Sequence, residues 1–112
     1  MIPIYLILNG FIYICNMNDK EIIAILQTEK KHLEDSFGVK SIALIGSYAK
    51  KEQTSQSDID FFVEFQKPSF NLLADLKLFL EQKFKKNIDI VRNGPHLSQR
   101  FLNHIKKEMI YV

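Results

Sequence analysis

The segment Val39–Ala49, VKSIALIGSYA, together with Asp58–Phe65, DIDFFVEF, decides the fold of this chain. The run SIALI is continuously apolar, which is typical of a strand buried on both faces. The second segment alternates strictly, which predicts a strand with two different faces. One face carries Ile59, Phe61, Val63 and Phe65, and the other carries Asp58, Asp60, Phe62 and Glu64. Residues 46–56 between the strands are small and polar, which indicates a turn or a helical turn.

Helices are expected on both sides of this pair. Asn18 and Glu21 form a capping pattern that begins the first helix, and Gly38 is a natural end for it. Residues 71–84 place apolar side chains at helical spacing and predict the clearest helix of the chain.

A third strand is expected over residues 88–91, followed by a last helix that Ser98 caps. The apolar residues expected to point inward from this helix are Phe101, Leu102 and Ile105. The apolar tail 109–112 is expected to pack or to pair at a sheet edge. The order helix, strand, strand, helix, strand, helix predicts an α/β architecture in which helices cover a small sheet.

The chain has 112 residues, 46% hydrophobic and 25% charged, with a formal net charge of +2. This composition predicts one globular domain and excludes a globally disordered chain. The charges are too evenly balanced for bulk attraction to nucleic acid, so we expect no direct nucleic-acid partner. A single cysteine excludes an intrachain disulfide, and the default compartment is the reducing cytoplasm.

Residues 1–16, MIPIYLILNGFIYICN, form an apolar leader without charges. They lack the basic start and cleavage site of a secretory signal and are interrupted before reaching the ~20 apolar residues of a membrane helix, so we expect no membrane partner. Their composition suits a strand or an aggregation-prone extension. Two interpretations stay open. In the first, translation begins at Met17, residues 1–16 lie upstream of the true start, and the domain covers residues 17–112. In the second, the leader adds a short strand or an oligomer contact.

Asp58 and Asp60 are two residues apart on the predicted strand, so both carboxylates project from the same face. Two adjacent carboxylates repel each other, and a divalent cation removes that penalty. Mg²⁺ in particular binds through one or two carboxylates plus substrate phosphates. Asp89 lies between Ile88 and Ile90 on another predicted strand, a half-buried setting where an unpaired charge is costly. It is the candidate third carboxylate of a metal cluster.

Gly46 and Ser47 directly follow the first buried strand. Glycine lets the backbone approach a ligand closely, and exposed amides beside the Ser47 hydroxyl form a phosphate-binding corner. Lys50 and Lys51 add positive charge next to it. Phosphates beside a divalent metal on paired aspartates are the arrangement used for phosphoryl or nucleotidyl transfer, in which one metal activates the attacking hydroxyl and another holds the triphosphate.

Each of these features alone is common in proteins that have no such site. Alternating surface strands often carry Asp-x-Asp, and Gly-Ser after a strand is usually a turn. Asp89 can pair with a lysine, and neighbouring lysines are ordinarily solubilising charge. Only the ordered combination predicts chemistry.

Four segments agree in order and spacing with one family. They are FGVKSIALIGSYAKKE (37–52), QSDIDFFVEF (56–65), NIDIV (87–91) and IKKEMIYV (105–112). Residues 17–112 resemble the DNA polymerase beta nucleotidyltransferase superfamily, and more closely its minimal nucleotidyltransferases of the MntA type, which are antitoxins of prokaryotic toxin–antitoxin pairs.

This resemblance implies an α+β fold, a small mixed β-sheet flanked by helices, and a two-metal Mg²⁺ site. The implied metal-binding and catalytic residues are Asp58, Asp60 and Asp89, the last helping to activate the incoming hydroxyl. The implied residues for the triphosphate of ATP are Gly46 and Ser47, beside Lys50 and Lys51. Such enzymes transfer AMP from ATP to a tyrosine of a partner HEPN-domain toxin, a ribonuclease, which they silence and bind in a heteromeric complex.

Lys51 departs from the family pattern, which usually has glycine there, so that GSYARG becomes GSYAKK. A lysine is unfavourable if the position needs a positive φ. A second interpretation is therefore a domain that neutralises the toxin by binding alone. A third, transfer to a small molecule such as an aminoglycoside, requires a further substrate-binding domain for which the chain has no residues left. Tyr48 is expected either to line the nucleotide pocket or to pack in the core.

Overall fold

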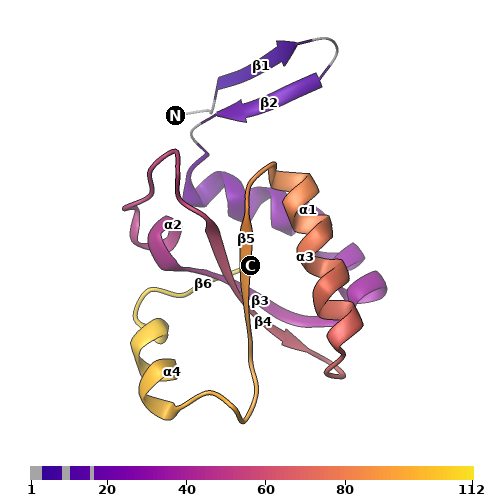
Figure 1. Ribbon diagram of the computed structural model, residues 1–112, viewed down its shortest axis with the longest axis vertical. Helices are drawn as coiled ribbons and strands as arrows, with labels where there is room; N and C mark the ends of the chain where they lie inside the picture. The colour runs from indigo at the N-terminus through magenta and orange to yellow at the C-terminus, as the bar shows by residue number, and fades with distance from the viewer. Residues whose placement is uncertain (1–3, 9–10, 16) are drawn as a thin grey trace.

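The computed structural model describes the backbone of residues 4–8 and 11–15 and the whole of residues 17–112. In the leader, β1 (Ile4–Leu8) and β2 (Phe11–Cys15) pair antiparallel in a two-stranded sheet of their own (Figure 1). The expectation of strand structure is confirmed for these two segments. Residues 1–3, 9–10 and 16 lie outside the described part of the chain, and translation from Met17 stays a prediction.

The rest of the chain alternates helices and strands. In order these are α1 (Asp19–Phe37), β3 (Val39–Ile45), α2 (Gly46–Lys50), β4 (Ile59–Phe65), α3 (Phe70–Phe84), β5 (Ile88–Arg92), α4 (Gln99–Lys106) and β6 (Ile110–Tyr111). Among these residues no helix has the length and apolar character that crossing a membrane requires.

The four-stranded sheet has the order β5-β4-β3-β6. β3 pairs antiparallel with both β4 and β6, whereas β4 and β5 are parallel. The mixed sheet expected from the family resemblance is therefore confirmed. The apolar tail pairs at the edge of the sheet, as the sequence predicts.

The expected caps begin and end the helices. The Asn18 side chain accepts a hydrogen bond from the Glu21 amide at 2.9 Å, and the Glu21 side chain accepts one from the Asn18 amide at 3.3 Å. Gly38 ends α1 with a φ of +66°, a conformation that favours glycine. Ser98 caps α4 through its hydroxyl as expected, and Ser69, which the sequence did not single out, caps α3 in the same way.

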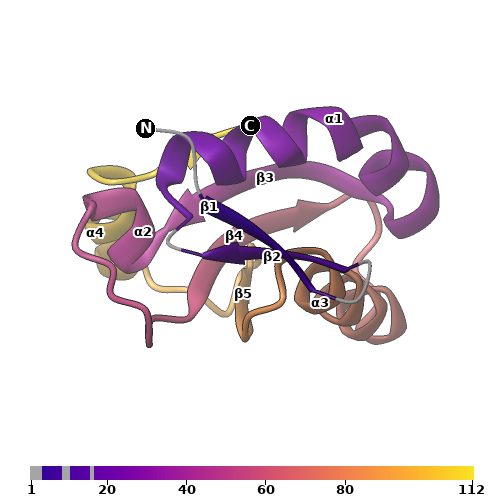
Figure 2. The same cartoon turned by 90° about the horizontal axis from the view of Figure 1, so that it is seen from above.

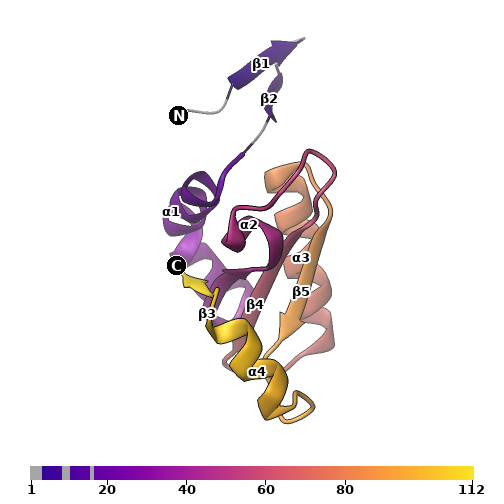
Figure 3. The same cartoon turned by 90° about the vertical axis from the view of Figure 1, so that its left-hand side faces the viewer.

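The two faces of the sheet bury different helices. On one face, α1 and α3 cover the apolar side of β4, and Figure 2 shows α1 running alongside β3. The buried residues that α1 and α3 contribute are Ile22, Leu26, Leu33, Leu76, Leu80 and Phe84. On the other face α4 covers Phe62 and Ala43, and it stands apart from α1 and α3 in Figures 1 and 3. Because α4 is short, part of this second face is left open.

One expectation about α4 is wrong. Ile105 is buried and Leu102 packs against the same small core, but Phe101 is 36% exposed. On this face Ala43, Ile45 and Phe62 form one buried cluster with Ile105, and Leu102 packs against it. Phe101 therefore lies outside this core.

Candidate active site

Asp60 lies near the start of β4, on the face of the sheet opposite the core that α1 and α3 cover. Its strand, β4, is paired on both sides, so that Asp60 faces Ile45 across the antiparallel ladder and Asp89 across the parallel one. Paired residues project from the same face of a sheet. The register therefore brings Asp60 and Asp89 together, although they are 29 residues apart in the sequence, Asp60 on β4 and Asp89 on β5.

The electrostatics of Asp60 reflect this crowding. The pKa of Asp60 is raised from its usual 3.8 to about 6, chiefly by burial and then by the charge of Asp89 and a side-chain hydrogen bond with Asp89. Such a bond between two carboxyl groups requires one of them to hold a proton. The charges of Asp58 and Glu108 make smaller contributions to the same increase. Asp60 therefore lies in a field of negative charge.

Asp58 and Asp89 differ from expectation in detail. Asp58 lies one residue before β4 rather than within it, and acts on Asp60 through its charge. Asp89 is exposed, although Ile88 beside it is buried, so the half-buried setting expected for Asp89 is wrong. A strand at the edge of the sheet buries one face only, and Asp89 occupies the open one.

The donor atoms of this cluster fit a hard divalent cation. They are all carboxylate oxygens. The negative charges around Asp60 disfavour its ionised form, and a bound cation would offset this repulsion. Within residues 17–112, however, no three His, Cys, Asp or Glu side chains are arranged as a ready-made metal cage. Asp60 and Asp89 make contact, and the expected three-carboxylate cage is not preformed.

The Gly-Ser turn lies directly beside Asp60. Gly46 begins α2 with a φ of +74°, and a Cβ on Gly46 would overlap Oδ2 of Asp60 and come within 3.1 Å of the Asp60 Cβ. Only glycine permits this approach of backbone to carboxylate. Ser47 follows at the next position and is half-buried. The phosphate-binding corner expected from sequence and the carboxylates thus adjoin each other.

The middle of α2 is anchored in the main core. Tyr48 is 2% exposed and packs among the side chains that α1 and α3 contribute. Of the two roles open to Tyr48 from sequence, the structure favours core packing. The anchor fixes the turn to the body of the domain.

The two lysines after the turn have different surroundings. Lys50 Nζ lies 3.6 Å from Oε2 of Glu108, in an ion pair. Lys51 is exposed and has a φ of +62° at the end of α2. The position does adopt the left-handed conformation that favours the glycine usual in the family, and lysine is accommodated there with backbone strain.

Glu108 is the site residue that sequence reasoning missed. It lies between α4 and β6, accepts a hydrogen bond from the Gly46 amide at 3.3 Å and contributes to the raised pKa of Asp60. The segment IKKEMIYV carries no periodicity or motif that separates Glu108 from an ordinary surface residue. Only the pairing of β6 with β3 brings it to the turn.

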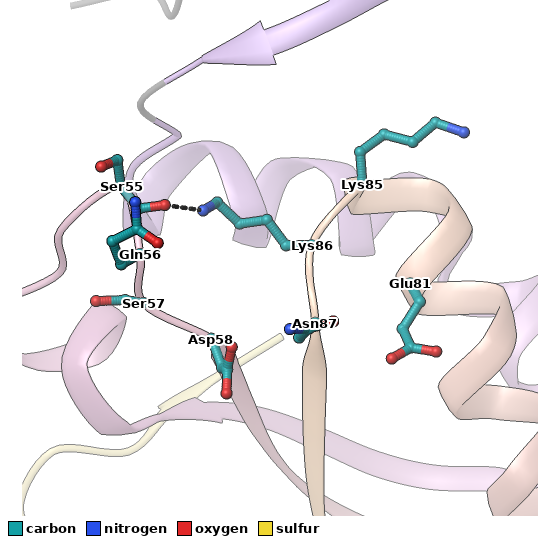
Figure 4. A pocket seen from close by; sticks show the side chains of 8 residues that line it. All are labelled: Ser55, Gln56, Ser57, Asp58, Glu81, Lys85, Lys86 and Asn87. Carbon is teal, nitrogen blue, oxygen red and sulfur yellow. Dashed lines mark hydrogen bonds between the residues drawn. The ribbon is translucent and has the colours of Figure 1, made fainter.

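A polar pocket of about 540 Å³ opens beside Asp58 (Figure 4). It lies between the loop before β4 and the turn that joins α3 to β5, two segments linked by a hydrogen bond of 3.0 Å from Lys86 Nζ to the Ser55 carbonyl. Its lining residues are Ser55, Gln56, Ser57, Asp58, Glu81, Lys85, Lys86 and Asn87. A molecule bound there would contact one of the carboxylates directly.

The family model described as the nucleotidyltransferase domain matches residues 20–112. The chain belongs to the nucleotidyltransferase domain family. A protein of Methanocaldococcus jannaschii named as a protein adenylyltransferase is 41% identical over 95 residues, which are 82% of this chain and 95% of that protein. The protein adenylyltransferase MntA of Thermococcus cleftensis is 33% identical over 94 residues, 83% of this chain and 94% of that one. The chain is thus a member of the minimal nucleotidyltransferases that include MntA.

Solved structures agree with this assignment. One described as a minimal nucleotidyltransferase superposes with a TM-score of 0.71 at 27% identity and covers 85% of this chain and 96% of its own. A toxin–antitoxin structure with AMP-PNP shares the fold with a TM-score of 0.60 at 21% identity, over 85% and 72% of the two chains. So does a complex of tri-AMPylated Shewanella oneidensis HEPN toxin with MNT antitoxin, with a TM-score of 0.55 at 16% identity over 79% and 69%.

Proposed function

We propose that this nucleotidyltransferase is a cytoplasmic, Mg²⁺-dependent protein adenylyltransferase that transfers AMP from ATP to a tyrosine hydroxyl of a partner HEPN ribonuclease toxin and so neutralises it. The observation that carries the proposal is the position of Asp60 between Gly46 and Asp89. Carboxylates for a cation and a turn for phosphates face the same space, as in-line nucleotidyl transfer requires. The names of the relatives support the reaction, and the HEPN complex of a structural neighbour supports the partner.

The residues have separate tasks in this reaction. Asp58, Asp60 and Asp89 would hold the cation, which when bound neutralises the triphosphate and lowers the pKa of the acceptor hydroxyl. Gly46 and Ser47 hold the phosphates, with Lys50 and Lys51 as nearby positive charge. Asp89, which like Asp58 is exposed, takes the proton of the hydroxyl. The tyrosine oxygen bonds to the α-phosphorus, the bond from that phosphorus to the bridging oxygen breaks, and diphosphate leaves.

The acceptor side chain approaches from the pocket beside Asp58. The triphosphate binds next to α2. The pocket between the loop before β4 and the α3–β5 turn is then available for the acceptor side chain. This pocket is polar and open, which suits an exposed loop of a partner protein better than an isolated apolar ligand.

A second candidate function is neutralisation by binding alone. Lys51 favours this function, because it has a φ of +62° at a position where the family usually has glycine. The phosphate-binding turn of this chain is therefore strained at its end. The contact between Gly46 and Asp60 persists despite Lys51, and for this reason we favour the catalytic function.

The test is incubation of the purified chain with its HEPN partner, ATP and Mg²⁺, followed by intact-mass measurement of the partner. We expect addition of adenylyl groups by the wild type and none by the double variant Asp58→Asn, Asp60→Asn. Glu64→Gln is the matched control, since Glu64 lies on the same face of β4 and pairs with Lys40 at 3.7 Å away from the turn. No addition by the wild type would overturn the catalytic function, and protection of cells by the double variant equal to that of the wild type would favour neutralisation by binding alone.

A further inference from the structure

One carboxylate from the end of the chain holds both ends of α2. Oε1 of Glu108 accepts a hydrogen bond from the Gly46 amide at 3.3 Å, and Oε2 lies 3.6 Å from Nζ of Lys50. Gly46 is the first residue of this five-residue helix and Lys50 is the last. Glu108 is 62 residues away from Gly46 in sequence, so the contact is tertiary.

The helix depends on this contact because it has little support of its own. A helix of five residues is too short to persist alone, and its first amides have no partner within it. The N-cap residue Ile45 has no side chain that could accept from them. Glu108 supplies the missing acceptor. Its side chain is 16% exposed, so water competes only weakly for the interaction.

The position of α2 sets the distance between the phosphate corner and the carboxylates. Gly46 packs so closely on Asp60 that no atom fits between them. Tyr48 and Ala49 fix the middle and the second half of the helix to the core, but not its first two residues. A shift of Gly46 therefore moves Ser47 relative to Asp60. We propose that Glu108 is a positioning residue of the nucleotidyl transfer, which holds Gly46 and Ser47 against Asp60 and keeps Lys50 oriented beside the phosphates. This inference rests on the proposed function.

Kinetics of Glu108 variants with ATP and Mg²⁺ test the inference. Loss of both contacts in Glu108→Ala is expected to raise the KM for ATP about tenfold, with a smaller fall in kcat. Glu108→Gln keeps an acceptor for the Gly46 amide and is expected to recover part of that loss. Because Lys50 is oriented through Glu108, adding Lys50→Ala to Glu108→Ala should change KM little further.

Glu29→Ala is the matched structural control. Glu29 forms an ion pair with Lys83 at 2.9 Å, is 22% exposed on its side chain and lies on α1, away from the turn. Both alanine variants are expected to lower Tm, and only Glu108→Ala to raise KM. Equal KM values in the two variants would overturn the inference. So would a lower KM in Glu108→Gln, because Glu108 would then compete with phosphate instead of positioning its site.

Calorimetric titration with ATP and Mg²⁺, without any acceptor protein, separates this inference from the proposed function. If the wild type binds ATP but modifies no HEPN partner, the proposed function fails and the Kd of Glu108→Ala still decides the role of Glu108. A Kd equal to that of the wild type overturns the positioning role. A wild type that binds no ATP overturns both.

Discussion

The backbone of Gly46 lies directly against the carboxylate of Asp60, so closely that a methyl group on Gly46 would occupy the place of Oδ2. Gly46 begins the turn after β3, and Asp60 lies on the neighbouring strand β4. The contact therefore joins the two motifs that the sequence separates by 13 residues, from Ser47 to Asp60. It fixes where a phosphate on the turn would lie relative to a cation on the carboxylates.

Gly46→Ala is expected to lower kcat by displacing the Asp60 side chain. The added methyl group meets the carboxylate, and the φ of +74° adds backbone strain. A misplacement of this kind lowers kcat by about 100-fold. Gly38→Ala is the control, because Gly38 has a similar φ of +66° but an added Cβ meets only Leu72 at an ordinary 3.5 Å. Both variants should lose about 1 kcal/mol of stability by chemical denaturation. Equal activity of the two would show that the contact with Asp60 is unimportant.

Lys51→Gly is expected to stabilise the protein. Glycine relieves the backbone strain at a φ of +62°, but it also gives the unfolded chain more conformational entropy. The free energy of unfolding should therefore rise by about 0.5 kcal/mol. Lys85→Gly makes the same change at a φ of +55° at the end of α3 and should give a similar gain. Urea denaturation measures both. If Lys85→Gly gains stability and Lys51→Gly loses it, the Lys51 side chain makes a contact that offsets its strain.

Asp89→Asn is expected to reduce the chemical step more than nucleotide binding. Asparagine keeps the size of the side chain but cannot take the proton of the acceptor hydroxyl, which lowers kcat by about 100-fold. The KM for ATP should change by less than about threefold, since Gly46 and Ser47 hold the phosphates. Single-turnover kinetics with excess enzyme isolate this step. A kcat like that of the wild type would assign proton acceptance to another group.

The strands and the positions of the main acidic residues follow from the sequence because each rests on a local pattern. The alternation of residues 59–65 predicts β4 and places Asp60 on the face opposite Phe61, as the buried core confirms. The apolar run before Gly46 predicts β3, and the Asn18–Glu21 capping box predicts the start of α1. These features need only neighbouring residues to determine them.

The features that sequence did not predict depend on register between distant segments. Glu108 reaches Gly46 only because β6 pairs with β3, and a two-residue strand has no pattern of its own. Asp89 is exposed because β5 lies at the edge of the sheet. Phe101 is exposed because the apolar cluster that α4 covers contains Leu102 and Ile105 but not Phe101. The left-handed backbone at Lys51 is a further case, since lysine itself does not indicate it.

Asp60→Asn is expected to stabilise the metal-free protein above pH 6. Since folding raises the pKa of Asp60 from 3.8 to about 6, its stabilising contribution is complete below pH 3.8 and is lost as pH rises through about 6. Asparagine stays neutral and avoids that loss. The pKa shift alone corresponds to a larger free energy, but Asp60 is partly exposed and water screens its charge. We therefore expect Asp60→Asn to raise the free energy of unfolding at pH 8 by about 1 kcal/mol.

Denaturation in EDTA between pH 4 and pH 8 measures this gain. It should grow with pH through the region around pH 6. Asp75→Asn, on the exposed surface of α3, is the control substitution. Adding Mg²⁺ with a non-hydrolysable ATP analogue should reverse the order, because only the wild type has the carboxylate that the cation requires. A pH-independent difference would mean that Asp60 does not lie in the negative field of Asp89, Asp58 and Glu108, and the proposed cation site would fail with it.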